Sequence, residues 1–518
     1  MNIYQIRIRQ EFEKLIAQIR LYDLKQLLAL GTRELFRVVS RIRLQEDADQ
    51  HILGAYGPNI LLLALAKGSR SGRWNIDRAG FLVLCKCLWD LQQTLQDNDS
   101  LEEEGEKIVR ALSEYKPDDP REMIPAYALP FARENSWLLL LARGITAQNW
   151  GRGISWNDWA FDVMVLDQLA KNSPELHKKL MTHFRVENAG MLYRTGLLLW
   201  TLSANQGGFL RLASVTETDG NVVNVPSQAC DRILQLMSFQ ESSVLPEWLT
   251  PLLDDRNAGY EAFHAPLMRS KPYVHLDITE SGSYALLAPV DYMRSFRHAV
   301  FSALYKLGSK GAVGDIIGAS IEASIITCFR SLLGKRVDDY SKVPEGADVV
   351  INFENFDLIV EIKSNVSSMT VAARLAPLDI PQIWGRLFKA AQQCAKTIAK
   401  RNNSRKNIAV IVVADNIVGE CMPFTSFAEE SGIKAKLGID QIEVVSWKQF
   451  QDLLTHMTPD AFARGVEAKW TSQNPLSQGP LVANRLKPTI TTKDYGHLKS
   501  FKTEMFGVLE SARARRWL

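Results

Sequence analysis

Residues 346–364 read Gly-Ala-Asp-Val-Val-Ile-Asn-Phe-Glu-Asn-Phe-Asp-Leu-Ile-Val-Glu-Ile-Lys-Ser. Two runs rich in β-branched residues flank a turn at Glu354-Asn-Phe-Asp357. Such runs on either side of a short polar break are typical of a β-hairpin. The sequence therefore predicts two strands, Asp348–Phe353 and Leu358–Ser364, joined by a four-residue loop.

Three charged residues lie near the open end of this hairpin. If the four loop residues are unpaired, Val350 lies opposite Glu361 and Asp348 lies opposite Lys363. Directly opposed residues share a face of a sheet, and so do residues two apart on one strand. We therefore expect Asp348, Glu361 and Lys363 to project from the same face.

Charges in apolar strands need a reason, because a buried charge is costly unless it is paired or binds a metal. Two adjacent carboxylates repel each other, and hard oxygen ligands in a site open to phosphate suit Mg²⁺. A neighbouring lysine can activate a water or stabilise developing charge, as metal-assisted hydrolysis of a phosphodiester requires. The alternative from the hairpin alone is a salt bridge between Lys363 and Asp348 at a strand end.

Two flanking helices add to this pattern. Glu322 lies on an apolar face of a helix predicted from Asp315 to Leu333, and Gly318 would let that helix approach a sheet closely. A second helix, predicted from about Gln382 to Arg401, is basic. The segment 381–414 holds seven Lys or Arg and no acid, which suits a polyanion or, alternatively, a solvated face.

Asp348, the Glu361-Ile362-Lys363 strand end, an upstream helical glutamate and a downstream glutamine helix together resemble the PD-(D/E)xK nuclease superfamily. The resemblance covers about residues 311–457, and alanine stands where the family motif has proline before the aspartate. It implies a restriction-endonuclease-like α/β domain with a central mixed sheet flanked by helices. It also implies Mg²⁺-dependent cleavage of nucleic acid, usually DNA, with Mn²⁺ able to substitute. Prokaryotic proteins of this layout often act in restriction or other defence against foreign DNA.

Carried over by the resemblance, Asp348 and Glu361 are metal ligands, joined by the backbone carbonyl of Ile362. Lys363 helps to activate the attacking water. The implied catalytic set also contains Glu322 and the helical glutamine, Gln393, with Gln392 as the alternative. Contacts to nucleic acid are expected from basic residues of the loop after the hairpin and of the basic helix: Arg374, Arg386, Lys389 and Lys396.

The rest of the chain sets the context for this motif. The 518 residues are 46% apolar and 23% charged, which predicts a globular protein of several domains. Six scattered cysteines without metal-site spacing suit the reducing cytoplasm, and the short apolar runs predict no membrane span. Helical periodicity dominates the first half, so we expect an α+β protein. The expected divisions are an all-helical region, a hairpin–helix connector, the nuclease-like domain and a basic C-terminal extension: residues 1–267, 268–310, 311–460 and 461–518.

Three alternatives stay open at this point. A nuclease-like domain can be a catalytically silent nucleic-acid-binding or assembly subunit. His275 and Asp277 with Ser281 or Ser283 form a Ser/His/Asp set on paper, although the usual nucleophile elbow is absent from the sequence. The helical half can bind a partner protein or a second copy of the chain, recognise substrate or hold the nuclease inactive.

Overall fold

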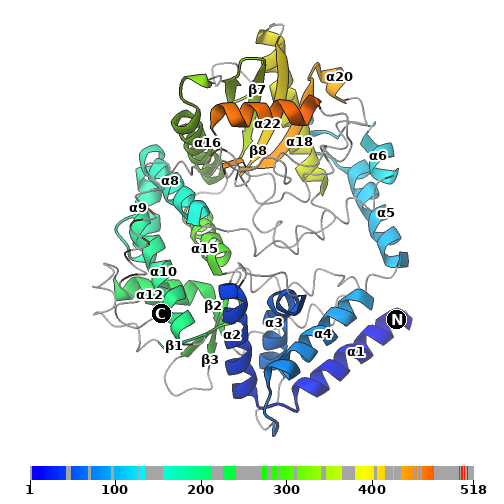
Figure 1. Ribbon diagram of the computed structural model, residues 1–518, viewed down its shortest axis with the longest axis vertical. Coiled ribbons are helices and arrows are strands. Elements are labelled where there is room, and N and C mark those ends of the chain that lie inside the picture. The colour runs from blue at the N-terminus through cyan, green and yellow to red at the C-terminus, as the bar shows by residue number, and fades with distance from the viewer. Residues whose placement is uncertain are drawn as a thin grey trace.

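The structure is a computed structural model of the chain (Figure 1). The described residues are 3–41, 48–67, 72–94, 98–134 without 125 and 127, 156–206, 208–211, 226–240, 271–276, 283–289, 292–308, 312–339, 346–364, 380–401, 405–414, 424, 433–447, 450–451, 454, 458–471, 501, 503, 505, 507 and 510. Within them the fold is α+β, as expected, with helices around two mixed sheets.

The predicted hairpin lies in a five-stranded sheet. Its first three strands are antiparallel neighbours and its last two continue in parallel, so the sheet is mixed. The central strand is buried along most of its length, which explains its run of β-branched residues. In spatial order the strands are β5 (Val337–Asp339), β6 (Val349–Asn352), β7 (Phe356–Lys363), β8 (Lys406–Val413) and β9 (Gln441–Ser446).

Helices cover both faces of this sheet (Figure 1). Alternation along β6 and β7 sends Val349 and Val360 to one core and Val350 and Ile359 to the other. The first core is covered by α16 (Ala312–Leu333), α8 (Trp156–Asn172) and α22 (Pro459–Thr471). The second is covered by α18 (Ile380–Arg401), α5 (Asn98–Glu114), α6 (Ala128–Glu134) and α20 (Ile433–Leu437).

The second sheet has four strands in the order β1 (Phe209–Arg211), β4 (Ser283–Leu286), β3 (Tyr273–Leu276) and β2 (Ser238–Gln240). The β3–β4 hairpin matches the prediction for the connector. One face of the sheet packs on α1 (Ile3–Ile19), α2 (Leu24–Arg41), α3 (Ala48–Lys67) and α4 (Arg78–Thr94). The other packs on α9 (Pro174–Phe184), α10 (Ala189–Asn205), α12 (Ser227–Met237) and α15 (Tyr292–Leu307).

The prediction of an all-helical region up to residue 267 is wrong in one respect, because β1 and β2 lie within it. Each has three residues, too few to show the alternation of a strand in the sequence. They form because the edges of the β3–β4 hairpin supply hydrogen-bonding partners.

The buried cores cross the expected domain divisions. Residues of α5 and α6 share one core with α18 and the five-stranded sheet, although more than 200 positions separate them. The C-terminal extension also contributes to the core, because Phe462, Val466, Phe501 and Met505 are buried. The five-stranded sheet is therefore enclosed both by segments that precede it and by segments that follow it in the chain.

Among the described residues, one helical segment, Ala312–Arg336, is long and apolar enough to cross a membrane by length and composition. It consists of α16 and the short turn η6 (Gly334–Arg336). Half of its most apolar window is buried, against α8 and the sheet among other elements. A core helix between two packed layers passes the same test, so this segment is explained by its position in the core.

Candidate active site

The β6–β7 hairpin is tighter than predicted. Val350 lies opposite Ile359 instead of Glu361, and the backbone N–H of Phe353 donates to the carbonyl of Phe356 at 3.0 Å. Phe356 belongs to the strand because its ring stacks on Phe353, with centroids 4.9 Å apart, and both are buried. Apolar burial therefore removes Phe356 from the expected loop.

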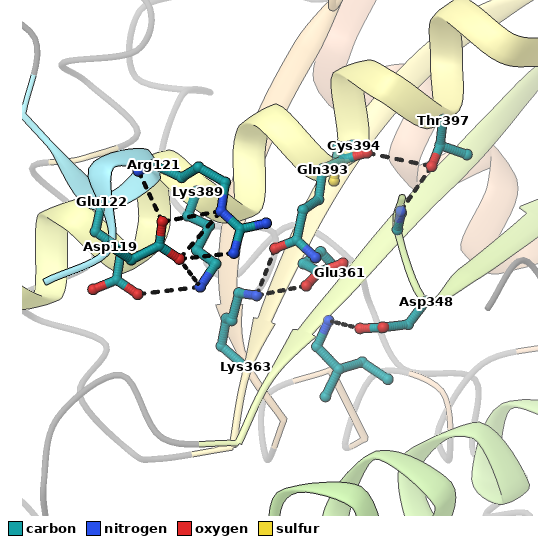
Figure 2. Close-up of polar contacts among 12 residues, drawn as sticks. Asp119, Arg121, Glu122, Asp348, Glu361, Lys363, Lys389, Gln393, Cys394 and Thr397 are labelled. Atoms are coloured by element: carbon teal, nitrogen blue, oxygen red, sulfur yellow. Dashed lines mark hydrogen bonds and ion pairs between the residues drawn. The ribbon is translucent and has the colours of Figure 1, made fainter. Parts of the chain in front are cut away.

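The shift in register does not extend to Asp348, which lies just before the first paired residue of β6. The backbone N–H of Asp348 donates to the carbonyl of Val360 at 3.1 Å, although Val360 is already paired with Val349, so the predicted pairing of Asp348 with Lys363 is wrong. The paired residues of β6 and β7 keep their predicted faces, because the pairing differs by two residues. Glu361 and Lys363 project toward α18, whereas the carboxylate of Asp348 is directed at the backbone N–H of Ile362, as Figure 2 shows.

Glu361 is the buried centre of the site. Its side chain is 2% exposed, and its Oε1 accepts a hydrogen bond from Lys363 Nζ at 2.6 Å. Its other oxygen, Oε2, is buried and has no hydrogen-bond partner among the described residues. Burial raises the pKa of Glu361 to about 8; the charge of Asp348 acts in the same direction and Lys363 opposes it. Burial and Asp348 disfavour the negative charge of Glu361, and a cation bound at the unpartnered oxygen would stabilise that charge.

Asp348 is held at the strand end by backbone groups. Its Oδ2 accepts a hydrogen bond from the backbone N–H of Ile362 at 2.7 Å. The preceding N–H, of Ala347, donates to the buried hydroxyl of Thr397 on α18 at 2.7 Å. These two contacts fix Asp348 between the sheet and α18, next to Glu361.

The carbonyl of Ile362 is directed to the same side. On β7 the carbonyl of Lys363 accepts from Ala414 beyond β8, whereas that of Val360 accepts from Asp348 beside β6. Successive carbonyls of a strand point in opposite directions. The carbonyl of Ile362 is therefore aimed toward the β6 side, where Asp348 lies.

Lys363 joins the strand to the helix. Its ammonium group donates to Glu361 and, at 2.8 Å, to the amide oxygen Oε1 of Gln393 on α18. The sequence left Gln392 as an alternative, and it is Gln393 that makes this contact. A lysine held from two sides has a fixed ammonium position, which general acid–base or electrostatic catalysis requires.

Glu322 approaches the site from the opposite layer. It lies on α16, is half-buried, and its charge contributes to the raised pKa of Glu361. The close approach expected at Gly318 is present, because a Cβ there would lie 2.9 Å from the hydroxyl oxygen of Ser364. Helix α16 therefore runs against the strand end that carries Lys363.

The expected nucleic-acid contacts are only partly available. Arg386, Lys389 and Lys396 follow one stripe of α18 together with Gln393, whereas Arg374 lies outside the described residues. Lys389 makes ion pairs with Asp119 at 2.8 Å and Glu122 at 3.4 Å. Its partners belong to a short turn, η1 (Pro120–Glu122), and its N-cap.

Sequence reasoning missed this turn. The segment Lys116-Pro-Asp-Asp-Pro120 reads as an ordinary surface break between helices, and its composition does not distinguish it from other loops. Its contact with α18 spans 267 positions of the chain. Proline beside acidic residues predicts a turn but does not predict what the turn touches.

The residues fit a magnesium ion, although they do not form an all-protein cage. Within the described part of the chain no three Asp, Glu, His or Cys side chains come together as metal ligands. Mg²⁺ is commonly held by one or two carboxylates, with waters and substrate phosphate completing its octahedron. Asp348, Glu361 and the carbonyl of Ile362 match that donor chemistry, and the unpartnered Glu361 Oε2 is a suitable ligand.

Among the described residues, the structure does not support the Ser/His/Asp alternative. His275 Nδ1 contacts Gln240 Oε1 at 3.1 Å, and its ring packs edge-on against Tyr284. In the register of β3 and β4, Ser283 pairs with Leu276 and not with His275. Asp277 and Ser281 lie outside the described residues.

Comparisons with known proteins add no relative: no family model, no curated protein and no solved structure matches the chain.

Proposed function

We propose that the chain is a Mg²⁺-dependent nuclease that hydrolyses phosphodiester bonds of nucleic acid, with DNA as the expected substrate. The observation that carries this proposal is Glu361, a buried carboxylate beside Asp348 with one oxygen on Lys363 and the other unpartnered among the described residues. A structural ion pair between Lys363 and Glu361 gains nothing from a second acid beside it, whereas a bound cation would offset the repulsion between the two acids.

Each residue has a defined part in the proposed reaction. Asp348, Glu361 and the Ile362 carbonyl would hold Mg²⁺. When bound, the ion lowers the pKa of water and offsets charge on the phosphate. Lys363 orients the attacking water and stabilises the charge that develops on the phosphate oxygens. Gln393 keeps the ammonium group of Lys363 directed at the site.

The second candidate function is a silent nuclease-like module that binds nucleic acid without cutting it. It is favoured by the hydrogen bonds of Lys363 to Glu361 and Gln393, because they give its ammonium group partners whether or not a metal is bound. Both functions place nucleic acid over the same face. They differ in whether a bond is broken.

Cleavage assays separate the two. Linear, circular and single-stranded DNA, and RNA, are incubated with the full chain in Mg²⁺, Mn²⁺ or EDTA, beside Asp348→Ala. We expect metal-dependent cutting by the wild type that is absent from the variant. Binding without cutting of any of the four substrates would support the module. Equal cutting by Asp348→Ala would place the active site elsewhere.

Metal binding is testable without activity. We expect saturating Mg²⁺ to raise the thermal midpoint of the wild type, since a ligand at about 100 times its Kd stabilises by ~2.7 kcal/mol. The increase should be absent in Glu361→Gln, which keeps the shape but loses the charge. Glu443→Gln is the matched control, because Glu443 is a buried glutamate of β9 in the same sheet. An equal Mg²⁺ effect in Glu361→Gln would contradict the assigned ligand.

A further inference from the structure

The turn η1 lies within about one helical turn of the candidate active site. Lys389 and Gln393 are four residues apart on α18, so their side chains are neighbours on one face. Lys389 contacts Asp119 and Glu122, while Gln393 contacts Lys363. Figure 2 shows both groups of contacts side by side along α18.

The position of this turn is fixed by packing. Ile108 and Leu112 of α5 and Ala132 of α6 are buried in the same core as Trp384 and Phe388 of α18. At Gly385 the helix has no side chain, and a Cβ there would lie 2.3 Å from the carbonyl oxygen of Glu122. The backbone of η1 therefore rests directly on α18.

Asp119 organises the charges of the turn. It caps η1 by accepting the backbone N–H of Arg121 at 3.0 Å. It also accepts two side-chain groups of Arg121, Nε at 3.0 Å and Nη2 at 2.9 Å, and the ammonium of Lys389. Donation by Arg121 first, and then by Lys389, holds the pKa of Asp119 well below its ordinary range.

Arg121 is the group of this cluster that reaches outward. Its side chain is 45% exposed, compared with 24% for Lys389. In Figure 2 its guanidinium extends from η1 toward Gln393 and Lys363. A guanidinium is planar and matches two phosphate oxygens at once, and a carboxylate behind it fixes its direction.

We propose that η1 forms a wall of the active site and that Arg121 binds a backbone phosphate of the nucleic acid next to the one that is cleaved. The inference deepens the proposed function, on which its substrate class rests. It makes the N-terminal half of the chain part of the substrate-binding surface, because η1 belongs to that half. Lys389 then acts with Asp119 as the support of Arg121.

Binding of a short fluorescein-labelled DNA duplex to the full chain in EDTA tests the proposal without turnover. We expect Arg121→Ala to weaken binding about tenfold at low salt, as loss of one charge-assisted contact implies. The slope of log affinity against log salt should fall by about 1, the value for one phosphate contact. Arg121→Lys should retain most of the slope but less of the affinity.

The matched control is Arg110→Ala. Arg110 lies on α5 in the same segment, is exposed and is also paired with an acid, Glu114, at 2.9 Å. Its loss should leave affinity and salt slope unchanged. Thermal midpoints of the variants confirm that the turn stays docked. Equal weakening by Arg110→Ala would reveal a general charge effect and overturn the proposal.

Wild-type affinity in Arg121→Ala would overturn the proposal, and so would tighter binding, which would make η1 a cover over the site. A wild type that binds no duplex would overturn it as well. The proposed hydrolysis fails separately. If Arg121→Ala weakens binding but the wild type cuts nothing, the role of η1 in binding nucleic acid is supported and the proposed hydrolysis is contradicted. If Lys363→Ala abolishes cutting while Arg121→Ala binds normally, the proposed hydrolysis is supported and phosphate binding by Arg121 is contradicted.

Discussion

Replacing Lys363 with alanine should lower the rate of nucleic-acid cleavage by at least about 100-fold, the usual contribution of a positioned acid–base or electrostatic group. Lys363 is the only one of the three hairpin charges that is a cation, and its ammonium is held by Glu361 and Gln393. Nucleic-acid binding should persist, because the basic stripe of α18 is unchanged. Single-turnover cleavage and duplex binding on the same preparation measure both effects.

The controls separate chemistry from folding. Lys363→Met keeps the aliphatic length of the side chain, so a folding defect limited to Lys363→Ala would be recognised. Lys406→Ala is the matched lysine variant, because Lys406 is exposed and lies opposite Phe356, at the other end of β7. It should cut like the wild type. Full activity in both Lys363 variants would exclude this site.

Gly385→Ala should destabilise the chain by about 3 kcal/mol, the upper part of the usual range for an overpacked site. The added Cβ would lie 2.3 Å from the carbonyl oxygen of Glu122 and 3.0 Å from the ring of Tyr115. The first contact is with backbone, which cannot rotate away as a side chain would. We expect η1 to move off α18, which should also weaken duplex binding if Arg121 acts as proposed. Urea denaturation and the same binding assay measure the two effects.

Gly314→Ala is the matched control, because Gly314 also lies in a helix, α16, and a Cβ there would meet no atom within 4 Å. Alanine has the better helix propensity, so this variant should be as stable as the wild type or up to about 1 kcal/mol more stable. A Gly385→Ala protein as stable as Gly314→Ala would mean that η1 is not anchored as the structure describes.

The residues of the candidate site could be predicted because the two-residue periodicity of a β-strand is visible in a short stretch of sequence. Glu361 and Lys363 lie two apart on β7, so the parity of strand positions sets their common face, and Asp348 directly precedes β6, the other strand of the hairpin. The register error came from Phe356, whose ring stacks on Phe353, and Phe353 in turn packs on Phe462 of α22, far along the chain. Since the error was two residues, the paired positions keep their predicted faces, whereas Asp348 lies outside the paired register.

Other parts of the structure had no local signal. The three-residue strands β1 and β2 exist because hairpin edges from elsewhere pair with them. The choice of Gln393 over Gln392 depends on which side of α18 meets Lys363. A deletion of residues 1–267 would remove α5 and α6 from the core beside the five-stranded sheet, so the functional tests use the full chain.

The hairpin, the shared face of Glu361 and Lys363 and the helices on either side could all be read from the sequence, as could the chemistry that such residues can perform. These features follow from strand and helix periodicity and from the cost of burying charge. By contrast, the docking of η1 on α18 and the pairing of Asp119 and Glu122 with Lys389 depend on tertiary packing. Glu122 and Lys389 are 267 residues apart, and their contact results from the packing of α5 and α6 on α18, to which no short stretch of sequence refers.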